Sequence, residues 1–292
     1  MKLLAPLFLL LAASLGHLPA QDAPAPSDSG PTLNQFLFEQ GGRHVPVRYY
    51  LPAGATPDAP VLIVMHGVKR NAETYLHEWT GYADQCHFLL IVPEFSEAEF
   101  PGSRGYQDGN LVTLSGQPLP RDQSTYNMIE PIFDQVCQRT GNTSQQYSIY
   151  GHSAGAQFVH RFVAFVPQAR ILHAVSANAG SYLLPDATQA FPFGFARSGL
   201  GDDALRAFLA KPLIVLLGTA DIHPDDPELP HEPGADAQGP YRLERGKNFF
   251  ASGQSAAATL GTPFGWTLSF APDIGHSDKG MAPFAVKLLF PQ

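Results

Sequence analysis

The sequence of 292 residues is poor in charge, and its basic residues are the scarcer kind. Only 15% of the residues are charged, and 18 Lys and Arg stand against 26 Asp and Glu, which gives a formal net charge of −8. Binding to a nucleic-acid backbone requires clustered Lys and Arg, and the sequence has no basic run. We therefore expect no nucleic-acid partner.

Cysteine is also scarce, because Cys86 and Cys137 are the only two in the sequence. An exported protein could oxidise such a pair to a disulfide. Whether these two residues can pair depends on where the fold places them.

The N-terminal apolar segment is too short to cross a membrane. Residues 3–15 are almost purely apolar, whereas a spanning helix takes about 20 residues. Lys2 precedes this segment and small or turn residues follow it, so residues 1–20 are predicted to be a signal peptide cleaved after Ala20. An uncleaved anchor is the alternative, and a lipoprotein anchor is disfavoured because no Cys follows. The protein is expected to be secreted or periplasmic, without a stable membrane anchor.

The remaining residues are apolar enough to bury a large core, since hydrophobic residues make up 44% of the chain. Residues 21–31, rich in Pro and Ser, are expected to be a disordered linker. Residues 32–292 are predicted to form a single domain in which strands alternate with helices. This alternation indicates the α/β class, with a mainly parallel sheet covered by helices on both faces.

The prediction rests on the following strand and helix segments. The apolar run at 60–65 is typical of a strand buried on both faces, and 33–40 and 45–50 are expected to pair antiparallel across Gly41-Gly42. Residues 94–122 are expected to be a long surface loop, and Pro131 disfavours an unbroken helix at 125–139. The other expected strands are 87–92, 147–150, 171–176, 212–217 and 265–270, and the other expected helices are 72–86, 154–166 and 281–290.

A candidate nucleophile lies between a strand and a helix. Gly-His-Ser-Ala-Gly at 151–155 fits the pattern G-x-S-x-G, which presents a serine hydroxyl on a sharp strand-to-helix turn. The pattern occurs by chance, but here a strand precedes it and an amphipathic helix follows it directly. Ser153 is therefore the predicted nucleophile; the alternative is a serine that only caps the helix.

A serine hydroxyl needs a base, and the base needs an orienting acid. His276 follows the last predicted strand and is the candidate base. Asp221 follows the strand at 212–217 and is the candidate acid. The nearby acidic residues are its rivals: Asp225, Asp226 and Glu228.

Two further groups of residues complete the predicted site. The oxyanion hole is expected to use the backbone N–H of Ala154 and a second N–H from the loop after His66-Gly67, which we assign by position to Val68. Tyr182 and Phe193 lie in an aromatic segment between two strands and are expected to line the substrate pocket.

These residues together resemble the α/β-hydrolase superfamily. The resemblance covers residues 33–290 and rests on His66-Gly67, the Gly-His-Ser-Ala-Gly motif, Asp221 and Gly275-His276. The order of Ser153, Asp221 and His276 along the chain is that of the superfamily. Within it, the chain is similar to secreted esterases of the polyhydroxyalkanoate depolymerase-like and feruloyl-esterase-like group. The resemblance implies an eight-stranded sheet and no cofactor.

The resemblance also bears on the cysteines. It implies a strand order in which the helices that carry Cys86 and Cys137 lie on opposite faces of the sheet. A disulfide needs Cα atoms within about 7 Å. We therefore expect two free, buried thiols.

The expected function is hydrolysis of a small-molecule or polymeric carboxylic ester through an acyl-enzyme. A serine peptidase and an acyltransferase would share the same residues, and a non-catalytic binding protein could share the fold. No metal is expected, because the nearby candidates match no zinc spacing: His223, Asp225, Asp226 and His231. The sequence leaves the oligomeric state open.

Overall fold

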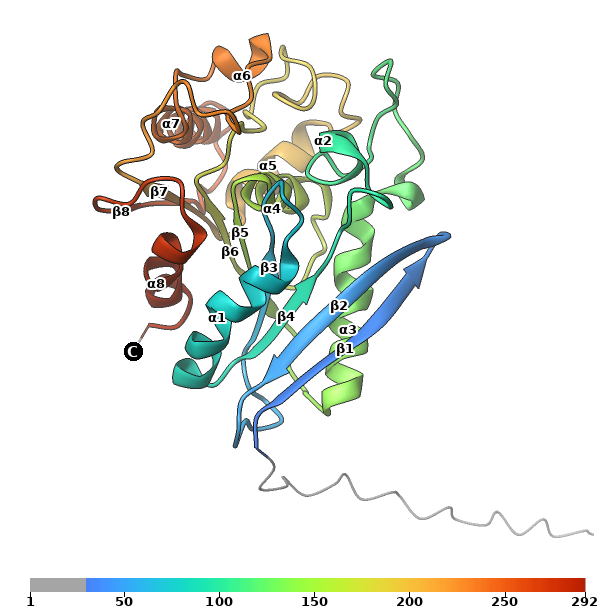
Figure 1. The fold of residues 1–292 in the computed structure, drawn as a ribbon. Coiled ribbons are helices and arrows are strands. Elements are labelled where there is room, and N and C mark those ends of the chain that lie inside the picture. Colours follow the sequence, from blue (N-terminus) through green and yellow to red (C-terminus); the bar gives the residue numbers. More distant parts are fainter. Residues whose placement is uncertain (1–29, 292) are drawn as a thin grey trace, which may run out of the picture.

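The computed structural model describes residues 30–291 and places all eight strands in one sheet (Figure 1). The strand order is β1-β2-β4-β3-β5-β6-β7-β8. Strands β1 and β2 pair antiparallel, β2 pairs antiparallel with β4, and every other pairing is parallel. The predicted α/β-hydrolase fold is confirmed. The predicted signal peptide and nearly all of the predicted linker lie outside the described residues.

The strands fall close to the expected segments. The two antiparallel strands are β1 (Thr32–Gln40) and β2 (Arg43–Leu51), joined by Gly41-Gly42 as expected. The remaining strands are β3 (Val61–Met65), β4 (Leu89–Pro93), β5 (Tyr147–His152), β6 (Ile171–Ala177), β7 (Leu213–Gly218) and β8 (Thr267–Ala271).

The central strands are buried on both faces because their side chains alternate between two cores. In β3, Val61, Ile63 and Met65 join one core, and Leu62 and Val64 join the other. Successive side chains of a strand point to opposite faces, so a continuous apolar run is needed where helices cover both.

Helices form one layer on each face of the sheet (Figure 1). One core contains side chains of α1 (Ala72–Cys86) and α8 (Asp278–Leu289), which pack against each other. The other core contains side chains of the remaining long helices: α3 (Ile129–Thr140), α4 (Ala154–Phe165), α5 (Asp202–Ala210) and α7 (Arg242–Leu260).

The structure departs from the sequence prediction in three places. The expected helix at 125–139 begins as a 3-10 turn, Thr125–Met128, so Pro131 falls in the first turn of α3 where its missing N–H costs little. The expected loop at 94–122 contains the short helix α2 (Gly102–Gly105). The helices α5 and α6 (Pro233–Asp236) and the bounds of α7 were not predicted.

Both cysteines are free, and they pack on opposite faces of the sheet. Cys86 packs against the core under α1, and Cys137 packs against the core under α3. Neither thiol is fully buried, which corrects that part of the expectation; both lie near helix ends, where covering side chains are fewer. Burial still raises the pKa of Cys137 to about 11, so this thiol stays protonated near neutral pH.

The loops that follow the parallel strands gather at one end of the sheet, with the short helices α2 and α6 (top of Figure 1). In open α/β sheets, ligands bind beyond the carboxyl ends of the strands. Among residues 30–291, no helix combines the length and the apolar character needed to cross a membrane.

Candidate active site

Ser153 occupies the turn between β5 and α4 with a backbone that few side chains adopt. Its φ is 58° and its ψ is −119°. A non-glycine residue held at positive φ costs on the order of 1–3 kcal/mol and persists only where the surroundings enforce it. Here Ser153 N donates to Ala177 O at 3.0 Å, and Ser153 O accepts from Gln157 N at 3.1 Å.

The two glycines of the motif permit this turn because backbone groups crowd them. A Cβ on Gly151 would lie well inside 3.0 Å of Gly155 O, and a Cβ on Gly155 would lie well inside 3.0 Å of Met65 O. Strand β5, helix α4 and strand β3 therefore approach more closely than any side chain would allow.

A chain of hydrogen bonds leads from Ser153 to a carboxylate. Ser153 Oγ lies 3.0 Å from His276 Nε2, and His276 Nδ1 lies 2.8 Å from Asp221 Oδ2. Asp221 is 1% exposed and Ser153 is 7% exposed, so water competes little for these contacts. The structure thus brings together the three residues that the sequence selected from separate loops.

Arg242 and Asp226 lie behind this carboxylate. Nothing in the sequence indicated Arg242, and Asp226 was expected only as a rival of Asp221. The Arg242 guanidinium is fully buried, and its Nη1 lies 3.4 Å from Asp221 Oδ1 and 3.1 Å from Asp226 Oδ2. Asp226 is therefore a partner of Arg242 and not of His276. Among the other rivals of Asp221, Glu228 contacts Lys69 at 2.8 Å and Asp225 is exposed.

Asn178 fixes the loop that carries His276. It follows β6 with a φ of 50°, a conformation that asparagine tolerates better than most residues. Its Oδ1 accepts from Gly218 N at 2.8 Å, and its Nδ2 donates to Gly275 O at 3.1 Å. One side chain thereby connects the end of β7 to the residue before His276. The only signal in the sequence was an asparagine directly after a strand.

A pocket of about 170 Å³ opens beside Ser153 and His276. Its walls are mainly polar and include Val68, Lys69, Tyr75, Glu78, Glu228 and Asp278. Val68 is 45% exposed, and Gly67 has no side chain to fill the space next to Ser153 Cβ. Larger hollows of 440 and 390 Å³ lie between β1 and α1 and around Gly199, away from Ser153.

Two buried histidines flank the site in neutral form. His66 accepts from Phe95 N at 3.0 Å, and burial lowers its pKa to about 3, so it serves to hold the loop after β4. The His152 ring lies 4.6 Å from the His276 ring, and its Nδ1 lies 3.4 Å from Tyr75 Oη. Burial, and then the neighbouring charges of His276 and Arg242, hold the pKa of His152 well below its usual value.

The expectation that Tyr182 and Phe193 line the pocket is not met. Tyr182 is completely buried and its ring stacks on Phe249 at 4.6 Å, within the core under α7. Phe193 packs against Gly234, in the first helical turn of α6. Neither belongs to the residues that line the hollow at Ser153. Aromatic content could not distinguish a core position from a pocket position.

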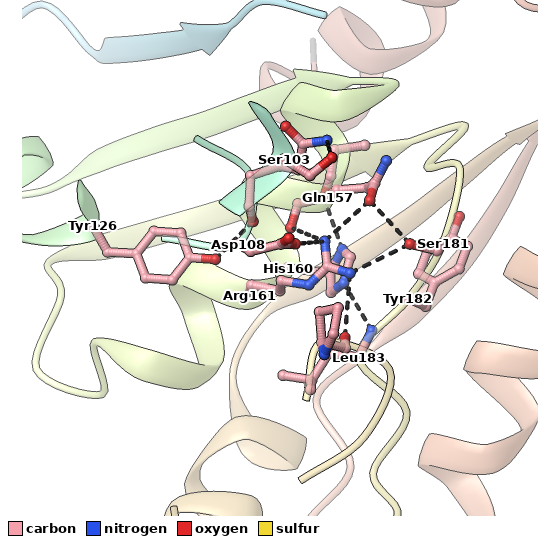
Figure 2. Close-up of polar contacts among 12 residues, drawn as sticks. Ser103, Asp108, Tyr126, Gln157, His160, Arg161, Ser181, Tyr182 and Leu183 are labelled. Carbon is pink, nitrogen blue, oxygen red and sulfur yellow. Dashed lines mark hydrogen bonds and ion pairs between the residues drawn. The ribbon is translucent and has the colours of Figure 1, made fainter. Parts of the chain in front are cut away.

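A buried arginine connects helix α4 to two neighbouring loop segments (Figure 2). Arg161 is completely buried, and it lies 3.5 Å from Asp108, 3.4 Å from Ser181 and 3.2 Å from Gln157. It also donates to Pro192 O at 3.2 Å. These contacts tie the loop around residue 108 and the segment 181–192 to the helix that begins at Ser153.

We expect Arg161→Met to lower the free energy of unfolding by about 3 kcal/mol, because it leaves the Asp108 carboxyl buried without a cation. The matched control is Arg170→Met, whose side chain is 35% exposed although it lies closer to its partners, at 2.6 Å from Glu130 and 2.7 Å from Asp134. That control should cost about 1 kcal/mol or less. Urea unfolding measures the loss for both variants. Equal losses of unfolding free energy would show that burial of an ion pair does not determine how much it stabilises the fold.

No group of three or more His, Cys, Asp or Glu residues within 30–291 is arranged to hold a metal ion. The cluster His223, Asp225, Asp226 and His231 therefore does not assemble into such a site.

The sheet, the turn at Ser153 and the contacts of His276 define the class of protein. The chain belongs to the α/β-hydrolase superfamily and is a hydrolase. No protein-family model matches the sequence, and no curated protein does.

Solved structures show which members of this superfamily the chain is similar to. The chain is 43% identical to poly(aspartic acid) hydrolase-1 from Sphingomonas sp. KT-1, over 89% of this chain and 99% of that one, with a TM-score of 0.86. It is 37% identical to LpqC, a poly(3-hydroxybutyrate) depolymerase from Bordetella parapertussis, over 89% of both chains, with a TM-score of 0.83. An S-formylglutathione hydrolase from Agrobacterium tumefaciens shares the fold at 16% identity and a TM-score of 0.59, covering 92% of this chain and 96% of that one.

Proposed function

We propose that this chain is a secreted serine hydrolase that cleaves carboxylic esters. The observation that carries the proposal is the unbroken hydrogen-bond path from Asp221 through His276 to Ser153. In this proposal Ser153 is the nucleophile, His276 is the general base and Asp221 holds the imidazole in the tautomer that accepts the serine proton.

The proposed reaction is acyl transfer in two halves. His276 takes the proton of Ser153 as the oxygen attacks the ester carbonyl, and it then gives that proton to the departing alcohol. A water molecule repeats the sequence on the acyl-enzyme. The negative oxygen of each tetrahedral intermediate would be stabilised by the N–H of Ala154, the first residue of α4, and by the N–H of Val68.

The charge around Ser153 favours an uncharged or cationic ester over a polyanion. Three carboxyl groups border the pocket, from Glu78, Glu228 and Asp278, against the single ammonium of Lys69. Burial and the contact with Glu78 raise the pKa of Asp278 well above its usual value, so Asp278 adds least to this negative charge. The two most similar structures discussed above carry the names of a poly(aspartic acid) hydrolase and a poly(3-hydroxybutyrate) depolymerase. A neutral ester fits this pocket better than a polymer of aspartate does, because like charges repel.

The sequence also supports export. We propose that residues 1–20 direct the chain out of the cytoplasm and are then removed, as their short apolar run and flanking residues indicate.

We expect a fluorophosphonate probe to label the wild-type protein at Ser153 and not to label Ser153→Ala. Mass mapping of the adduct locates the reactive residue. A panel of uncharged esters, the corresponding amides and added acceptor alcohols then separates an esterase from a peptidase and an acyltransferase. Absence of labelling together with absence of ester hydrolysis would favour a non-catalytic binding protein and would refute the proposal.

A further inference from the structure

Two carboxyl groups face each other on the wall of the pocket beside Ser153. The Asp278 carboxyl lies in hydrogen-bond contact with the side chain of Glu78, and both residues line the pocket. Asp278 is 8% exposed and already accepts from Tyr150 Oη at 2.8 Å and from Trp79 Nε1 at 3.2 Å. Burial and the contact with Glu78 raise the pKa of Asp278 well above its usual value.

Two carboxyl groups in contact need a proton or a cation to offset their charge. Two carboxylates in contact cannot both be ionised in a partly desolvated place, so they share a proton or bind a cation. The nearby cations are already neutralised, because Lys69 pairs with Glu228 at 2.8 Å and Arg242 pairs with Asp221 and Asp226. The pocket therefore retains a negative field that no basic side chain at its walls cancels.

A second polar group of the same pocket also lacks a partner. His152 is 4% exposed and lines the pocket, and its Nε2 is buried with no hydrogen-bond partner among the described residues. Leaving a buried polar atom unpaired costs on the order of 1–3 kcal/mol. A bound ligand that carries a polar hydrogen or a lone pair would satisfy it.

We propose that this pocket binds a small organic ammonium group of the substrate, held against the paired carboxyl groups of Glu78 and Asp278. The proposal rests on the proposed ester hydrolysis at Ser153 and adds the class of substrate. An ammonium group supplies positive charge beside the two carboxyls and an N–H donor for Glu78, since Asp278 already accepts from Tyr150 and Trp79. A metal ion fits less well, since no group of three or more His, Cys, Asp or Glu residues is assembled within residues 30–291. A volume of 170 Å³ holds about five or six groups of the size of water, so the amine lies within a few bonds of the scissile carbonyl.

Paired substrates that differ only in charge test the proposal. On the alcohol side, 2-(dimethylamino)ethyl acetate is compared with 3-methylbutyl acetate; on the acyl side, methyl 3-aminopropanoate is compared with methyl butanoate. At pH 7 we expect kcat/KM for the amine to exceed that for its neutral counterpart by at least about tenfold in one pair, in keeping with hydrogen bonds to a charged group.

The variants assign this preference to the pocket. Glu78→Gln should reduce the ratio within the preferred pair to about one. The matched control is Glu73→Gln, because Glu73 lies on the same helix but is exposed and away from the Ser153 pocket. That control should keep the wild-type ratio.

A wild-type measurement keeps the test independent of how the variants fold. 3-Methylbutylammonium should inhibit the hydrolysis of 3-methylbutyl acetate competitively, at a concentration at least about tenfold lower than 3-methylbutan-1-ol does. Hydrolysis of the neutral esters with no preference for either amine, or equal inhibition by the ammonium and the alcohol, overturns the subsite and leaves the ester hydrolase intact. If none of the four esters is hydrolysed, both proposals fall.

Discussion

Replacing Asp221 by Asn should lower kcat for ester hydrolysis by a factor of about 10⁴, the size of effect seen when the acid of a serine triad is made neutral. The Asn amide would donate to His276 Nδ1, which now lies 2.8 Å from Asp221 Oδ2. The proton would then reside on Nε2, and the ring could not accept the proton of Ser153. Steady-state kinetics on an uncharged ester measures the loss.

Asp226→Asn is the control for this substitution, because Asp226 shares Arg242 with Asp221 but forms no hydrogen bond with His276. We expect its kcat to stay within about tenfold of the wild type, since the tautomer of His276 does not depend on it. A loss as large for Asp226→Asn as for Asp221→Asn would mean that the acid has been assigned to the wrong residue.

Replacing Gly155 by Ala should lower the free energy of unfolding by about 3 kcal/mol or more and remove activity. The added Cβ would overlap with Met65 O and His66 O, which are backbone atoms that cannot rotate away. Strand β3 would have to separate from helix α4, and the turn at Ser153 would open. Thermal or urea unfolding measures the stability, and fluorophosphonate labelling reports the turn.

Gly81→Ala is the matched substitution in a helix with open space. Gly81 is exposed within α1 and a Cβ there would contact nothing within 4 Å, so the change should stabilise the protein by roughly 0.5–1 kcal/mol. If Gly155→Ala were as harmless as Gly81→Ala, the close approach of the backbones would not be what holds the nucleophile turn.

The site residues that the sequence could predict are those whose place is set by the end of a strand. Ser153 directly follows the buried strand β5, Asp221 lies just beyond the buried strand β7, and His276 lies in the loop after the partly exposed strand β8. The carboxyl ends of neighbouring parallel strands meet at one edge of the sheet. The apolar runs of β3 and β7 marked those strands clearly. Their boundaries moved by one or two residues, because hydrogen bonding and not hydropathy decides where a strand ends.

The parts that were missed depend on contacts between distant segments. Helix α7 contains Gly246 and Gly253, which weaken a helical pattern. In the fold these glycines let α7 lie against Leu217 and Trp266, where a Cβ would approach the neighbouring side chains within 3.0 Å. Without that helix Arg242 could not be placed, so its contact with Asp221 was invisible in the sequence.

Pocket residues were the least predictable. Tyr182 was chosen for its aromatic ring, yet that ring fills the core, whereas the pocket is formed by Glu78 from α1 and Asp278 from α8. Nothing local to either acidic residue indicated that the two helices lie side by side.

The position of β8 at the edge of the sheet has a consequence for the order in which the protein is made. His276 comes 123 residues after Ser153, and it reaches the serine only when β8 has paired with β7 and α8 has packed on α1. A ribosome-bound chain that already contains the turn at Ser153 would still lack its proposed base. Catalytic competence would thus be acquired late in biosynthesis, so esters in the compartment of synthesis would not encounter a working enzyme on unfinished chains.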